Sequence, residues 1–164
     1  MSRSIELLKK RYLENIKEKP DLFVGIELEY PVINLEGKAT DIEIVKDLFR
    51  YLSTVLGFSI EKVDDFGNPI QLLDPVSQDR ILFEVAYTTV EFAFGRAKSI
   101  QEVEEHFRDY MDLIQKKLGE TNHAIVGSGI HQYWEESENQ PVAYPRYQML
   151  MNYLKLSRTV PGMD

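Results

Sequence analysis

Apolar and acidic side chains alternate along residues 22–34, and this alternation limits what the chain can fold into. The β-branched and aromatic residues here, bounded by Pro20 and by a glycine-containing turn after residue 34, predict a β-strand. Successive side chains point to opposite faces of a strand, so Glu27 and Glu29 share one face and the apolar residues share the other. Such a strand needs a core on one side and leaves two carboxylates together on the opposite side.

Two carboxylates on one strand face need an explanation, because they repel each other. Alternate residues of a strand lie roughly 7 Å apart. At an effective dielectric constant of about 20, two unit charges at that distance repel each other by about 2 kcal/mol. A divalent cation bound between them would remove this cost, since hard cations take carboxylate oxygens. The alternative is a solvated strand face that carries two glutamates and no ligand.

A second acidic segment, residues 81–94, repeats the pattern. Bulky apolar residues around Glu91 point one way, and Glu91 points the other way between two smaller residues. Glu84 precedes it by seven positions, across a predicted bend. Two strands that each send carboxylates to one face would make a metal-binding cup, whose candidate ligands are Glu27, Glu29, Glu84 and Glu91. A solvated face is again the alternative.

The rest of the chain predicts an α+β fold. Periodicity, capping boxes and turn residues predict helices over residues 4–18, 40–57, 99–119 and 144–157, and strands over 22–34, 58–63, 70–73, 80–87, 89–94 and 123–131. Short strands joined by turns favour a mostly antiparallel sheet with helices packed on one face. A chain of 164 residues is long enough for a single domain with one core.

Composition argues against several classes of protein. The net charge of −8 disfavours non-specific nucleic-acid binding, and no apolar run approaches the ~20 residues that span a bilayer. The chain has no cysteine, which removes disulfides, thiolate metal sites and cysteine nucleophiles. We therefore expect a cytoplasmic protein with no nucleic-acid partner and no membrane partner.

The predicted C-terminal helix is apolar on nearly every side, which indicates burial against several neighbours. A polar loop is expected before it, over residues 135–140, and the chain then ends in a loop over 161–164. We interpret residues 1–164 as the N-terminal part of a longer catalytic domain. A complete domain that buries this helix by self-association is the alternative.

Arg146 begins this helix, where its charge opposes the helix dipole. Binding an anion would explain the position, and a solvated arginine is the alternative. His106 and His123 are expected to pack or to lie at the surface. His131 follows two glycines that permit close backbone approach, but the chain has neither a dinucleotide-binding fingerprint nor a phosphate-binding glycine–lysine loop.

Three segments together resemble the glutamate–cysteine ligase family of the glutamine-synthetase-like superfamily. They are the Gly-Ile-Glu-Leu-Glu-Tyr strand at 25–30, the Thr-Val-Glu-Phe-Ala strand at 89–93, and the run from 129 to 154 that contains Pro-Arg-Tyr-Gln-Met-Leu-Met-Asn-Tyr-Leu. Their order and rough spacing agree with the family across most of the chain. At residues 85–88 this chain has Val-Ala-Tyr-Thr, where many members have Pro-Gly-Gly-Gln.

The resemblance implies half of a glutamine-synthetase-like catalytic domain and a defined chemistry. Family members use ATP to phosphorylate the γ-carboxylate of glutamate, and the amine of cysteine then displaces phosphate, the first step of glutathione synthesis. Strand glutamates hold Mg²⁺ (or Mn²⁺), so by match Glu27, Glu29 and Glu91 would be metal ligands, with Glu84 as an addition. Arg146 would bind substrate. No catalytic residue is assigned.

Two functions therefore compete. One is part of an ATP- and Mg²⁺-dependent ligase, which we expect to be inactive as 164 residues alone because the family is much longer. The other is a short, non-catalytic homologue that acts as a ligand-binding or interaction module. The small-molecule partners expected for the ligase are glutamate, cysteine and ATP.

Overall fold

Six antiparallel strands form one sheet in the order β2–β3–β4–β5–β1–β6. The computed structural model describes residues 2–133 and 140–157. The loops expected over 135–140 and 161–164 therefore lie outside the described residues, except for residue 140. The strands are β1 (Glu27–Asn34), β2 (Ser59–Val63), β3 (Pro69–Leu73), β4 (Arg80–Phe83), β5 (Thr89–Ala93) and β6 (His123–Ile125). The helices are α1 (Arg3–Leu13), α2 (Ile42–Val55), α3 (Ile100–Gly119) and α4 (Pro145–Ser157).

The predicted α+β class with a mostly antiparallel sheet is confirmed, but several predicted elements are too long. The first strand begins at Glu27, because Val24 makes only an isolated bridge to Ala97. The fourth strand ends at Phe83 rather than at 87, because Val85 has a φ of 60° and turns the chain. The last strand ends at Ile125 rather than at 131. Backbone conformation at single residues decides these ends, and side-chain periodicity does not report it.

Helices α2 and α3 form where their apolar stripes meet the sheet. Each begins at a side-chain cap: the Asp41 carboxylate accepts from the Glu43 amide, and the Ser99 hydroxyl accepts from the Glu102 amide. Helix α2 begins later than the helix predicted over residues 40–57, because the Thr40 hydroxyl donates to the Val32 carbonyl at 2.7 Å and does not cap the helix. The buried residues of the two helices are Val45, Leu48, Phe49, Leu52, Val103, Tyr110, Ile114 and Leu118.

The core fills the space between these two helices and one face of the sheet. Phe49 of α2 stacks on Phe83 of β4 with ring centroids 3.8 Å apart, and both rings are fully buried. Val90 and Phe92 of β5 are buried in the same cluster. Because side chains alternate along each strand, this packing directs the intervening residues of β1 and β5 to the opposite face.

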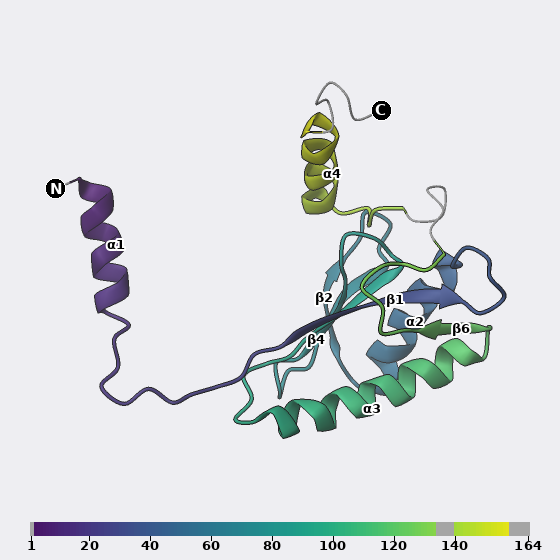
Figure 1. Cartoon of the computed structure of the whole chain (residues 1–164), viewed down its shortest axis with the longest axis horizontal. Coiled ribbons are helices and arrows are strands. Elements are labelled where there is room, and N and C mark those ends of the chain that lie inside the picture. Colours follow the sequence, from purple (N-terminus) through teal and green to yellow (C-terminus); the bar gives the residue numbers. More distant parts are fainter. Residues whose placement is uncertain (1, 134–139, 158–164) are drawn as a thin grey trace.

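Helices α1 and α4 behave differently from α2 and α3. No residue of α1 is buried, and the helix stands apart from the sheet at the end of an extended segment (Figure 1). It ends at Leu13 rather than at 18, because no buried contact holds a further turn. Helix α4 lies on the other side of the sheet from α3 (Figure 1), where Tyr147 is buried while Met149, Tyr153 and Leu154 are exposed. Self-association through α4 therefore stays a prediction.

A buried carboxylate, Asp79, ties three elements together at one end of the sheet. It accepts hydrogen bonds from the Gly95 amide at 2.7 Å, the Tyr110 hydroxyl at 2.9 Å and His106 Nδ1 at 2.7 Å. Burial raises the pKa of Asp79, but these hydrogen bonds outweigh burial and hold the pKa below its ordinary value. The turn before β4, the end of β5 and helix α3 are thus joined through one ionised side chain.

We predict that Gly95→Ala destabilises the protein severely. A Cβ atom at Gly95 would lie 2.0 Å from the Ser77 carbonyl oxygen, so the backbone would have to move and the hydrogen bond to Asp79 would be strained. The expected loss in the free energy of unfolding is about 3 kcal/mol, measured by urea denaturation.

Gly119→Ala is the matched control for this substitution. A Cβ atom at Gly119 meets nothing within 4 Å, so this variant should be neutral or slightly stabilised. Equal stability of the two variants would contradict the close packing of Ser77 against Gly95.

Candidate functional site

The register of the central strands brings the predicted glutamates to one place. Glu29 of β1 lies directly opposite Glu91 of β5, and Glu27 lies opposite Ala93. On the other side of β5, Leu82 of β4 lies opposite Glu91. Residues that oppose each other in an antiparallel pair project from the same face, which here is the face away from the core.

A cavity of about 260 Å³ opens on this acidic face. Its lining residues come from six parts of the chain: Glu27, Glu29, Lys62, Ile70, Gln71, Leu82, Glu84, Glu91, Tyr144, Arg146 and Tyr147. All five residues proposed from the sequence as metal-binding or substrate-binding therefore line one cavity. Whether they hold a metal or a substrate stays a prediction.

The segment before α4 closes one side of the cavity and is held there by its own hydrogen bonds. The Val142 amide donates to the Val85 carbonyl at 2.7 Å, and the buried Tyr147 hydroxyl donates to the Phe83 carbonyl at 2.8 Å. Both acceptors lie at the end of β4, next to Glu84. Arg146, which is exposed at the first turn of α4, is fixed by this anchoring at the rim of the cavity.

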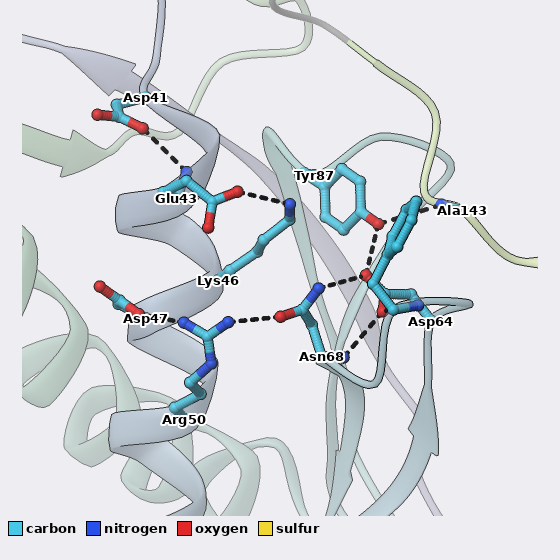
Figure 2. Close-up of polar contacts among 10 residues, drawn as sticks. Asp41, Glu43, Lys46, Asp47, Arg50, Asp64, Asn68, Tyr87 and Ala143 are labelled. Carbon is cyan, nitrogen blue, oxygen red and sulfur yellow. Dashed lines mark hydrogen bonds and ion pairs between the residues drawn. The ribbon is translucent and has the colours of Figure 1, made fainter.

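A polar network behind the cavity fixes the same segment to the β2–β3 turn (Figure 2). The Tyr87 hydroxyl donates to the buried Asp64 carboxylate at 2.7 Å and accepts from the Ala143 amide at 3.2 Å. Asp64 also accepts from the Asn68 side chain, whose oxygen accepts from Arg50 of α2 (Figure 2). Burial raises the pKa of Tyr87 to about 12, so the hydroxyl keeps the proton that it donates. The network thus connects α2, the turn and the cavity wall.

Glu91 is the buried member of the acidic group, with 8% of its surface exposed. Burial raises its pKa to about 7, together with a hydrogen bond to Glu84 and the charges of Glu84, Glu27 and Glu29. A hydrogen bond between two carboxyl groups requires a proton, and the raised pKa of Glu91 means that Glu91 carries one part of the time near neutral pH. Crowding of negative charge is therefore a measurable property of this cavity.

The donor set suits a hard divalent cation, although it is not assembled around one. Four carboxylates offer the oxygen ligands that Mg²⁺ and Mn²⁺ take. Among residues 2–133 and 140–154, however, no three acidic or histidine side chains already converge on a metal position. Glu27 and Glu29 are exposed, so their side chains have room to rotate toward Glu91 once a bound cation offsets the repulsion. The cavity fits a metal in chemistry and would need side-chain movement to bind it.

Two further cavities adjoin this one, and each shares a glutamate with it. A cavity of about 240 Å³ lies between Glu29 and the 128–131 loop. His131 fixes that loop, because its Nε2 lies 2.9 Å from the Val32 carbonyl oxygen. A cavity of about 600 Å³ on the other side includes Glu27, Arg80 and Arg96. The second of these adds cations that the sequence interpretation did not single out.

Each histidine has a structural partner. His106 lies beside Asp79, as described above. The buried His123 accepts from the Asp41 amide through Nε2 at 3.3 Å, and its Nδ1 lies 2.7 Å from the Thr121 carbonyl oxygen. The residue that sequence reasoning missed in the main cavity is Lys62, because the irregularity of β2 that places it there leaves no pattern in the sequence.

Glu91→Gln should stabilise the protein in the absence of metal at pH 8. The pKa of Glu91 is raised from 4.5 to about 7, so its contribution to stability is fully present below pH 4.5 and is lost as the pH rises to about 7. The glutamine variant avoids that loss. Urea denaturation of both proteins at pH 8 and pH 4.5 should therefore give a difference that vanishes at the lower pH.

The control for this experiment is Glu18→Gln, which changes an exposed glutamate outside the cavity and should show no such pH dependence. A Glu91→Gln protein that is less stable than wild type at pH 8 would show that the carboxylates are not crowded.

Tyr87→Phe should loosen the cavity wall. The variant leaves the Ala143 amide and one Asp64 oxygen without the hydroxyl, at a cost of about 1–2 kcal/mol in the free energy of unfolding. Hydrogen exchange of the Ala143 amide should become faster by more than the loss in the free energy of unfolding alone would cause. Tyr51→Phe, which removes the hydroxyl of a half-buried tyrosine of α2 outside this network, is the control, and equal exchange in both variants would exclude the network as the anchor.

Comparison with known proteins adds no assignment to this geometry. No protein-family model and no curated protein sequence matches the chain. In the part of the chain that the structure describes, no helix combines the length and the apolar character needed to cross a bilayer.

Proposed function

We propose that this chain supplies the acidic, metal-binding part of an ATP- and Mg²⁺-dependent ligase that joins the γ-carboxylate of glutamate to the amine of cysteine. One observation carries the proposal: Glu27, Glu29, Glu84 and Glu91, from three separate segments, line a single cavity together with Arg146. The resemblance of the sequence to the glutamate–cysteine ligase family assigns metal binding to the same glutamates. We place the enzyme in the cytoplasm as part of this proposal.

In this proposal each group in the cavity has a distinct task. Glu27, Glu29 and Glu91 hold Mg²⁺ or Mn²⁺, with Glu84 as a further ligand. The metal supplies charge neutralisation for phosphoryl transfer. Glu91 must lose its proton when a metal binds, so binding is favoured as the pH rises through about 7. Arg146 attracts and orients an anionic substrate from the rim.

The adjoining cavity of about 600 Å³ supports a place for the nucleotide. It shares Glu27 with the main cavity, so a phosphate chain on a metal at Glu27 could extend into it. Arg96 is exposed there with its guanidinium over the Phe23 ring at 5.1 Å, and Arg80 is paired with Glu61 at 2.9 Å. Cations beside the glutamates offset part of the repulsion that a protein of net charge −8 exerts on a triphosphate.

A non-catalytic interaction module is the second candidate. Exposed apolar side chains on α1 and α4, including Leu8, Tyr12, Met149 and Tyr153, favour it, because such surfaces mark contacts with other molecules. In that case the protein would self-associate through α4, and the acidic cavity would have no turnover. The two candidates differ in whether metal and nucleotide bind in the same cavity.

Metal titration by calorimetry tests the proposal. We expect weak Mg²⁺ or Mn²⁺ binding that Glu27→Gln reduces about tenfold, or 1.4 kcal/mol, since one ligand is lost. Glu18→Gln should leave the affinity unchanged. An ATP analogue should bind more tightly with metal than without it. Equal metal affinity in wild type and Glu27→Gln would remove Glu27 from the site.

An ADP-release assay with glutamate, cysteine, ATP and Mg²⁺ tests the separate expectation that these 164 residues are inactive alone. Turnover that survives purification and disappears in Glu29→Ala would overturn that expectation and would support the ligase proposal directly.

A further inference from the structure

Lys62 is a cation in the wall of the acidic cavity, and the fold places it there by an irregularity. In the pairing of β2 with β3, Ile60 lies opposite Leu72, Lys62 opposite Gln71 and Val63 opposite Pro69. The register therefore shifts by one residue before Lys62 and shifts back after it, which is a local bulge with no net extra residue. In a regular strand consecutive side chains point to opposite faces. A strand that directs Glu61 to Arg80 would then turn Lys62 away from the cavity.

The bulge changes that outcome. Glu61 still reaches Arg80, with Arg80 nitrogens 2.9 and 3.1 Å from its two oxygens, while Lys62 lines the cavity on the same face. Bulges next to functional sites commonly re-aim a side chain in this way. Strand β2 thus places the carboxylate of Glu61 in an ion pair with Arg80 and places Lys62 in the wall of the cavity.

Within the described part of the chain Lys62 makes no ion pair at contact distance, although its charge also acts on the neighbouring Glu61. Lys38, Lys46 and Lys117 all lie within 2.7 Å of a carboxylate oxygen, whereas Lys62 lies 6.0 Å from the centre of the Tyr144 ring. Tyr144 precedes Arg146 by two residues in the segment that closes the cavity. Lys62, Tyr144 and Arg146 all line the same cavity.

We propose, on the basis of the proposed function, that Lys62 and Arg146 form a carboxylate subsite that selects a dicarboxylate amino acid. One acid group of the ligand lies at the glutamates and their metal, and the α-carboxylate lies between the two cations. A cavity of about 260 Å³ has room for one molecule of this size. Because four glutamates repel any anion, the cations of this wall fix which way the ligand enters.

Phosphate shares this chemistry with carboxylate, so the nucleotide is the other source of an anion. The larger cavity beside Glu27 has its own arginines, Arg80 and Arg96, and lies next to a different part of the sheet. Lys62 lines the main cavity and does not line that one. This separation favours the α-carboxylate as the partner of Lys62.

The test compares L-glutamate with γ-aminobutyrate, which keeps the γ-carboxylate and lacks the α-carboxylate. With Mg²⁺ present, calorimetry on the full chain should show that wild type prefers glutamate by roughly tenfold or more. Lys62→Gln should abolish most of that preference by weakening glutamate alone. Lys62→Arg should restore it, and Lys38→Gln, which changes a lysine outside the cavity, should leave it intact.

Each outcome bears on one proposal. An unchanged preference in Lys62→Gln, or a loss of affinity for a non-hydrolysable ATP analogue instead of glutamate, overturns the subsite and leaves the metal site standing. If wild type binds no Mn²⁺ but Lys62 still controls the glutamate preference, the subsite stands and the ligase proposal fails. If wild type binds neither metal nor glutamate, both are wrong. Thermal unfolding of Lys62→Gln at the wild-type temperature shows that the variant is folded.

Discussion

The antiparallel pairing of β1 with β5 is the interaction on which the rest of the structure depends. It joins strands β2 to β5 to strands β1 and β6, and its register places Glu29 directly opposite Glu91. A slip of one residue would exchange the core face of β1 for its acidic face, so the hydrophobic core and the acidic cavity are fixed by one alignment. A change in this register would therefore disrupt the core and the cavity together and would lower the stability of the protein.

Buried carboxylates have two opposite roles in this protein. Asp64 and Asp79 are surrounded by donors, which hold the pKa of each below its ordinary value in spite of burial. Glu91 is surrounded by other carboxylates, which together with burial raise its pKa. Asp64 and Asp79 stabilise turns that support the cavity, whereas Glu91 adds electrostatic repulsion inside it. The free energy contributed by the hydrogen-bonded aspartates can therefore offset the unfavourable burial of Glu91 at a position where a ligand can bind.

Much of the fold could be predicted from the sequence, because alternation and helical periodicity report which faces are buried. The class, the sheet and the helices α2 and α3 follow from such patterns, as does the common face of Glu27 and Glu29. The ends of elements could not be predicted, since the positive φ of Val85 has no residue-type signature. The partners of Asp79 come from β5 and α3, which are distant in sequence, so they also could not be inferred.

The cavity shows the same division between local and non-local information. Glu27, Glu29 and Glu91 belong to regular strands and were predictable, whereas Lys62 depends on a bulge that only pairing with β3 reveals.

The bulge in β2 has a consequence for how the sequence of the protein can evolve. The sign of the charge that β2 presents to the cavity depends on the local pairing of Lys62 with β3, not only on the identity of the residues. Deletion of one residue at position 61 would shift Val63 out of its register with Pro69 and remove the partner of Arg80, and an insertion would displace Lys62. Point substitutions in β2 can change the charge of this cavity wall in small steps. An insertion or deletion in the strand would change it in a single step.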